Sequence, residues 1–212
     1  MKAGKVRKKV LALLLAGTAI LGLTGGGTMQ VEAAGQENAY VDTSSYEQLY
    51  KLYEDYFKLG IACQAMDHWN DPTAEIGNQE KEELINRMFN SMTFGNELKP
   101  AYNFDASSEN LFKVDFAAEE MLEWAKENNM KVRGHVLVWH SQVDPSIFAI
   151  DYQAYADGKL TKSDTAKLDE ECLVDREELL ARLKRYIYGV LEYTYKNGYA
   201  DVIYAWDVVN EA

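Results

Sequence analysis

Polar side chains gather in and after three apolar segments of the sequence, at residues 91–99, 131–142 and 202–211. They are Asn96, Glu97 and Lys99 after the first segment, His135, Trp139, His140 and Gln142 in and after the second, and Asp207, Asn210 and Glu211 in the third. Amide groups and a lysine can hydrogen-bond sugar hydroxyls, and an indole ring offers an apolar face for sugar C–H groups. A carboxyl group can exchange a proton with a glycosidic oxygen. Together these residue types predict a carbohydrate site.

The elements that must position these residues alternate between two hydrophobic patterns. A period of three to four residues predicts helices, and short apolar runs predict buried strands. The expected helices cover residues 43–57, 80–89, 114–130 and 175–198, and the expected strands cover residues 59–66, 90–99, 131–140 and 202–211. We expect the last helix to end at Gly198. This α/β alternation predicts a parallel sheet with right-handed crossovers, either a barrel or an open doubly wound sheet.

Ligand sites in such sheets lie at the carboxyl ends of the strands. Alternation along a strand places His135, Leu137 and Trp139 on one side and His140 on the other, which favours His135 over His140 as a site residue. The same rule places Asp207 and Glu211 on one face. Because a carboxylate inside a barrel needs a partner, we expect Asp207 to pair with His135 on the adjacent strand and to support the site from below.

The first 34 residues resemble a secretory signal peptide. Five basic residues precede an apolar run from Val10 to Leu23, and the small-residue sequence "VEAAG" follows. We expect cleavage after Ala33 or Ala34 and a secreted protein, the alternative being an uncleaved N-terminal anchor. Residues 35–212 keep 17 basic and 33 acidic residues, a net charge of −16. This charge argues against nucleic acid and anionic membranes as partners and suits a neutral substrate.

Two observations limit the other classes of site. The turns between strands and helices contain no GxGxxG sequence and no phosphate loop, which disfavours nucleotide binding. The three histidines and two cysteines show no metal-ligand spacing, so we expect neither a metal nor a cofactor. We expect Cys63 and Cys172 to be free thiols, because Cys63 lies in an apolar run and Cys172 in an acidic loop.

Three segments resemble consecutive signature blocks of glycoside hydrolase family 10, the endo-β-1,4-xylanases. They are "FNSMTFGNELKP", "KVRGHVLVWHSQ" and "YAWDVVNEA", in the family's order and spacing. The resemblance extends from about residue 44 to residue 212. It implies a (β/α)8 TIM barrel and retaining hydrolysis of xylan without a metal or cofactor, with residues 35–212 forming about the first four β/α units.

The resemblance also implies roles for individual residues. Glu211 matches the general acid/base and Asn210 the residue that hydrogen-bonds the sugar hydroxyl beside the scissile bond. Asn96 and Lys99 match contacts on the non-reducing side, and His135, Trp139 and Gln142 match the wall of the site. Gly95 departs from the pattern, because the family commonly has glutamate there. One sugar contact is therefore expected to be missing or supplied by another residue.

A retaining glycosidase needs two carboxyl groups about 5–5.5 Å apart. The resemblance places the nucleophile near the end of a seventh strand, so we expect this sequence to be the N-terminal part of a longer xylanase and to be inactive without the C-terminal half of the barrel. The expected partner is xylan or a xylo-oligosaccharide. The alternatives are a non-catalytic carbohydrate-binding remnant and a related β-glucanase.

Overall fold

The structure is a computed structural model, and it describes residues 42–65, 71–159 and 172–211. The expected signal peptide, residues 1–34, lies outside these ranges. Within them, four parallel strands form one sheet in the order β1-β2-β3-β5. The strands are β1 (Gly60–Cys63), β2 (Ser91–Phe94), β3 (Lys131–Gly134) and β5 (Ile203–Trp206). The predicted parallel sheet is confirmed.

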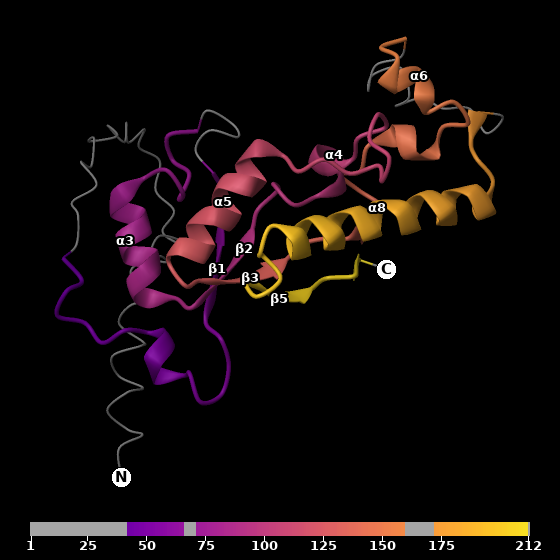
Figure 1. The fold of residues 1–212 in the computed structure, drawn as a ribbon. Coiled ribbons are helices and arrows are strands. Elements are labelled where there is room, and N and C mark those ends of the chain that lie inside the picture. The colour runs from indigo at the N-terminus through magenta and orange to yellow at the C-terminus, as the bar shows by residue number, and fades with distance from the viewer. Residues whose placement is uncertain (1–41, 66–70, 160–171, 212) are drawn as a thin grey trace, which may run out of the picture. The chain divides into compact units, whose positions relative to one another are not determined.

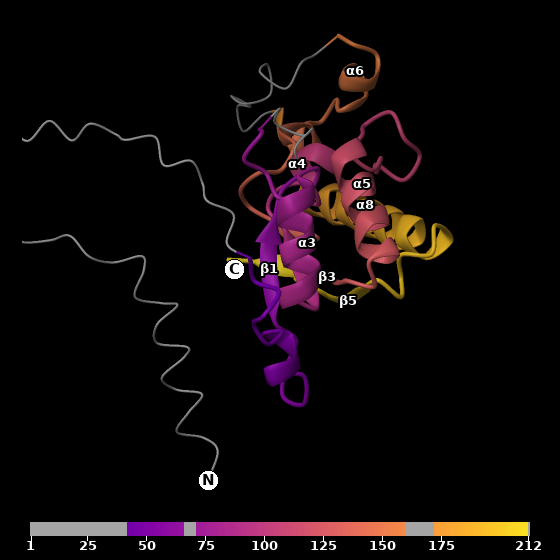
Figure 2. The ribbon, with the colours of Figure 1, turned by 90° about the vertical axis from the view of Figure 1, so that its left-hand side faces the viewer.

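In the described ranges, the three helices of ten or more residues in the connections between these strands are α3 (Gln79–Met88), α5 (Phe116–Glu127) and α8 (Arg176–Lys196). Figures 1 and 2 show all three on the same face of the sheet. An aspartate or asparagine side chain caps the N-terminus of each helix. Gly198 has a φ of 73° and follows Asn197, the C-cap residue of α8, so the predicted end of α8 is confirmed.

The main core lies between the helices and this face of the sheet. Met92 of β2 and Val132 of β3 are fully buried against Met121 and Leu122 of α5. Strand alternation then places Ala62, Thr93, Arg133 and Ala205 on the opposite face, and they form one row across the four strands. The site residues that follow the strands lie on this second face.

The prediction of one strand over residues 131–140 and one over 202–211 was wrong. Each is divided, and the second pieces, β4 (Val138–Trp139) and β6 (Val209–Asn210), form a separate parallel pair. Leu137 packs in a second core cluster against α8 and is 5% exposed. It therefore does not share the side of His135 that simple alternation predicted, because burying its side chain against α8 outweighs a continuous strand.

The predicted helix over residues 43–57 was also wrong. The structure has only a short 3-10 helix, η1 (Tyr50–Leu52), with turns on both sides. Tyr56 is 82% exposed and Phe57 is 53% exposed, so the apolar side chains of the pattern have no core to bury them. Because a short helix depends on tertiary packing of its apolar face, the periodic pattern alone does not produce one here.

The two cysteines are free, as predicted. Cys63 is buried and Cys172 is exposed. Burial raises the pKa of the Cys63 thiol to about 12, and the negative charges of Glu75 and Glu97 act in the same direction. In the part of the chain that the structure describes, there is no helix with the length and apolar character that spanning a membrane requires.

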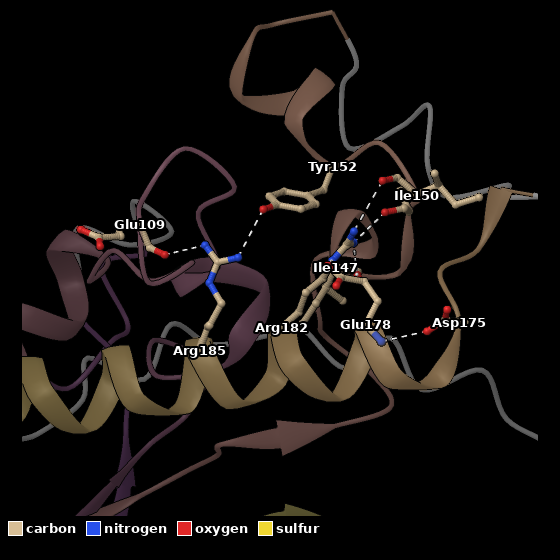
Figure 3. A network of polar contacts seen from close by, with 9 residues as sticks. Glu109, Ile147, Ile150, Tyr152, Asp175, Glu178, Arg182 and Arg185 are labelled. Carbon is tan, nitrogen blue, oxygen red and sulfur yellow. Dashed lines mark hydrogen bonds and ion pairs between the residues drawn. The ribbon is translucent and has the colours of Figure 1, made fainter.

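The described part of the loop after β4 contains two short helices, η2 (Pro145–Phe148) and α6 (Gln153–Ala156), and α8 is hydrogen-bonded to the segment around η2. Arg182 of α8 is 2% exposed, and its Nη1 donates to the carbonyls of Ile147 at 2.9 Å and Ala149 at 2.6 Å. Its Nε donates to Glu178 Oε1 at 2.8 Å, and its guanidinium lies 4.2 Å from the centre of the Tyr152 ring. Figure 3 shows Arg182 beside Ile147, Ile150 and Glu178, and the Tyr152 hydroxyl directed toward Arg185.

Arg182→Met should therefore destabilise the chain by about 3 kcal/mol, because it leaves buried carbonyls without donors and Glu178 without its cation. Arg185→Met, one turn further along α8, is the matched control. Arg185 is exposed and donates to the Tyr152 hydroxyl in this loop and to the Glu109 carbonyl in the segment before α5, so its loss should cost less than about 1 kcal/mol. Urea unfolding measures both changes, and equal losses would contradict the assigned role of Arg182.

Candidate active site

The turn after β2 is fixed by two buried polar side chains. Glu97 is 0% exposed, and its carboxylate accepts from the backbone N–H of Ala65 at 3.0 Å and of Asn96 at 2.9 Å. Asn103, in the short helix α4 (Pro100–Asn103), donates to the carbonyls of Glu97 at 2.6 Å and Lys99 at 3.0 Å. These bonds join the turn to the end of β1 and hold the backbone that carries Asn96 and Lys99.

Lys99 lies at the centre of the polar cluster. Its Nζ donates to Asn96 Oδ1 at 2.8 Å and lies 5.0 Å from the centre of the Trp139 ring. The residue is 8% exposed. Burial lowers the pKa of the Lys99 ammonium group, while the negative charges of Glu97 and Glu211 act in the opposite direction. A cation is therefore held between an amide and an aromatic face.

Glu211 is exposed and reaches this cluster from the strand pair β4 and β6. Trp139 Nε1 donates to Glu211 Oε2 at 3.1 Å. The pairing of Trp139 with Asn210 in these two strands places the indole beside the carboxylate. Glu211 itself has a φ of 51°, a conformation that is uncommon outside glycine. The carboxylate is thus both oriented by a donor and open to a ligand.

Below this group, Asp207 connects strands β3 and β5. His135 Nδ1 lies 2.9 Å from Asp207 Oδ2, which is the contact predicted from the sequence. Arg133 was not predicted, and its Nε and Nη2 donate to Asp207 Oδ1 at 2.9 and 2.6 Å. The His135 ring lies 6.4 Å from the Trp139 ring, between centres. Strand alternation, which places Arg133 two residues before His135 on the same face, could have identified it.

The protonation of Asp207 follows from these contacts. Burial acts to raise the pKa of its carboxyl group, but the hydrogen bonds from His135 and Arg133, together with the charge of Arg133, outweigh burial and lower the pKa below its usual range. Asp207 is therefore ionised at neutral pH. An ionised Asp207 accepts the Nδ1–H of His135, which leaves Nε2 of the ring free to face a ligand.

Gln142, a predicted site residue, lies at the margin of the cluster, and so does His140, which strand alternation disfavoured. Gln142 is exposed, and its backbone carbonyl accepts from Ala101 N at 2.8 Å, which joins the loop to α4. His140 is exposed, and its ring lies 5.9 Å from that of Trp139. The structure thus brings Asn96, Lys99, Trp139 and Glu211 into contact, places the His135–Asp207 pair below them, and leaves Gln142 at the margin.

A cavity of about 350 Å³ adjoins Glu211 and extends beneath β4 toward α8. Its polar boundary is formed by Trp139, His140, Asn210 and Glu211, and its remaining lining is apolar, including Leu137 and Tyr186. Within the described ranges, Glu211 is the one carboxylate on this boundary. Groups of three or more His, Cys, Asp or Glu side chains placed to hold a metal ion do not occur among the described residues.

Comparison with known proteins gives a consistent result. The model of "Glycosyl hydrolase family 10" matches residues 48–212. Endo-1,4-beta-xylanase B of Butyrivibrio fibrisolvens is 36% identical over 168 residues, which are 75% of this chain and 23% of that protein. Beta-1,4-xylanase of Dictyoglomus thermophilum is 30% identical over 207 residues, which are 97% of this chain and 43% of that protein. The chain therefore spans less than half the length of these relatives.

Solved structures of xylanases are also similar to this chain. An intracellular xylanase of Thermoanaerobacterium saccharolyticum superimposes with a TM-score of 0.58 at 30% identity, covering 79% of this chain and 44% of that one. A xylanase of Clostridium thermocellum, solved in complex with xylohexaose, gives a TM-score of 0.58 at 29% identity and covers 77% of this chain and 28% of that one.

Proposed function

The chain belongs to glycosyl hydrolase family 10, and we propose that its polar cluster is the part of a retaining endo-β-1,4-xylanase site that carries the general acid/base, Glu211. The observation that supports this role is the position of the Glu211 carboxylate. It accepts from the Trp139 indole and lies beside the Lys99–Asn96 pair. The relatives and solved structures that are named xylanases support xylan as the substrate.

In the proposed reaction, Asn96, Lys99, His135 and Asn210 hydrogen-bond sugar hydroxyls and Trp139 and Gln142 form the wall. Glu211 gives its proton to the glycosidic oxygen while a second carboxylate attacks the sugar and forms a covalent intermediate. The ionised Glu211 then takes a proton from water, which hydrolyses the intermediate. The second carboxylate would come from the other half of a (β/α)8 barrel.

The test compares the 212-residue chain with a complete barrel, in which this segment is followed by the second half of a family 10 barrel. We expect the chain alone to release no reducing sugar from xylan above the blank. A retaining site needs two carboxyl groups, and among the described residues Glu211 is the one carboxylate on the boundary of the cavity. The complete barrel should hydrolyse xylan. Hydrolysis of xylan by the sequence-verified chain alone would contradict this division of the site.

The same assay separates the substrate classes. A complete barrel that hydrolyses mixed-linkage glucan or cellulose better than xylan would assign the site to a β-glucanase. One that binds xylo-oligosaccharides without hydrolysing them would assign it to a carbohydrate-binding protein.

We also propose that the protein is exported by means of residues 1–34. This proposal rests only on the order of basic, apolar and small residues in that segment. In N-terminal sequencing, the exported protein should begin at Ala34 or Gly35, and an N-terminus before Ala34 would contradict the expected cleavage.

A further inference from the structure

The strand register identifies one more residue on the face of the sheet that carries the site. Ala62, Thr93, Arg133 and Ala205 form a row across the four strands. Two residues further along the strands, the next positions on this face are Gln64, Gly95, His135 and Asp207. Gly95 N donates to the Cys63 carbonyl and Asp207 N to the Gly134 carbonyl, so the pairing continues to this level. Gln64 is therefore in the layer that contains the His135–Asp207 pair.

Within this layer, Gly95 leaves a space that Gln64 fills. A Cβ atom at position 95 would lie 2.8 Å from Cγ and 3.0 Å from Nε2 of Gln64. The first separation is shorter than real Cβ contacts and the second is at the tight limit, so the Gln64 side chain occupies the volume that a side chain at position 95 would use. The carboxamide thus lies against the backbone of Gly95, directly before Asn96.

The backbone of Gln64 is held firmly, while its carboxamide has no protein partner in the described ranges. Gln64 N donates to Glu75 Oε2 at 3.1 Å, and its carbonyl accepts from the N–H groups of Glu75 and Ile76. The next residue, Ala65, donates to the buried Glu97. None of the described side chains or backbone groups hydrogen-bonds the half-buried carboxamide, which is consequently available to a ligand.

We propose that Gln64 is a specificity-determining residue that hydrogen-bonds a hydroxyl of the bound xylo-oligosaccharide, in the space left by Gly95 and beside Asn96 and Lys99. The inference rests on the proposed function. A carboxamide both donates and accepts, as a sugar hydroxyl does, so the pair is chemically matched without a charge. The sheet order β1-β2-β3-β5 separates Gln64, after β1, from the segment after β5 that carries Glu211, so the contact should bind a sugar unit that is not the one being protonated.

A double-mutant cycle in the complete barrel tests this contact. Gln64→Ala should lower kcat/KM on xylopentaose about 3- to 10-fold, the usual range for one neutral hydrogen bond. Gly95→Ala should cause a similar loss, because the new Cβ displaces the carboxamide that is still present. In the Gln64→Ala background, Gly95→Ala should have little further effect, since the atoms it would meet are gone.

Two comparisons separate substrate binding from a structural effect. Both variants should act far less on a short aryl xyloside that reaches only the sugar position beside Glu211. Gln79→Ala, which removes an exposed glutamine on α3, is the matched control and should leave both substrates unaffected. If the wild-type barrel hydrolyses xylopentaose and Gln64→Ala matches the control, the inference is wrong. If the wild-type barrel does not hydrolyse xylan at all, the proposed function fails first.

Discussion

Replacing Glu211 by alanine in the complete barrel should lower kcat/KM on xylan about 10²- to 10⁴-fold, the usual contribution of a general acid. The loss on an aryl xylobioside with an acidic phenol as leaving group should be much smaller in the glycosylation step. A phenolate leaves without a proton, whereas the alkoxide released from xylan must be protonated as the bond breaks. The ratio of the two losses therefore reports the proton transfer itself.

Glu127→Ala is a suitable control for this variant, because it removes an exposed glutamate at the end of α5 and leaves the site intact. It should behave as wild type on both substrates. If Glu211→Ala reduced the rates on xylan and on the aryl substrate by the same factor, Glu211 would be a binding residue or the nucleophile. The assignment of the acid/base role would then be withdrawn.

The second large effect is expected at the pair below the site. Asp207→Asn in the complete barrel should lower kcat/KM on xylan about 10- to 100-fold, although Asp207 is not expected to contact substrate, because small displacements of catalytic groups have effects of this size. The variant loses the carboxylate that Arg133 and His135 share. His135 is then free to rotate or change tautomer, and the backbone before Asn210 and Glu211 loses a connection to β3.

A cycle with His135→Gln tests whether the two residues act as one unit. Each single variant should lose nearly as much as the double variant, so the losses should be strongly non-additive. Since the pKa of Asp207 is lowered from its usual range, this contribution should be fully present at neutral pH and disappear only as the pH falls through the lowered value. Additive losses would show that the hydrogen bond between His135 and Asp207 does not couple them.

Strand and helix patterns were sufficient to predict most of this fold. The short runs at Gly60–Cys63 and Ser91–Phe94 are followed by turns and could be predicted as strands, and α8 has an N-terminal cap, a long amphipathic pattern and Gly198 after it. The predicted helix near Tyr50 failed because periodicity does not reveal whether a core is present to bury the apolar face. The prediction of two continuous strands failed because the burial of Leu137 depends on α8, which is distant in the sequence.

The site residues, too, could be predicted where local sequence patterns determine their positions and not where distant contacts do. The motifs identified Asn96, Lys99, Trp139 and Glu211, and the structure places them together. The contact of His135 with Asp207 could be predicted because both lie on adjacent strands with definite parity. Glu97 and Gln64 could not be assigned in this way. Their positions depend on where the end of β1 lies relative to the turn after β2, which the sequence does not specify locally.

The central claim is that Glu211 is the general acid/base of a retaining site. The most direct test is to incubate Glu211→Ala, in the complete barrel, with an aryl xylobioside and sodium azide and to determine the structure of the product. Without the base, water attacks the covalent intermediate slowly, and the small azide anion can enter the space that the carboxylate leaves. We expect the rate to rise with azide concentration and the product to be the β-xylobiosyl azide, with retained configuration. An α-azide, or a rate that azide does not change, would contradict the claim.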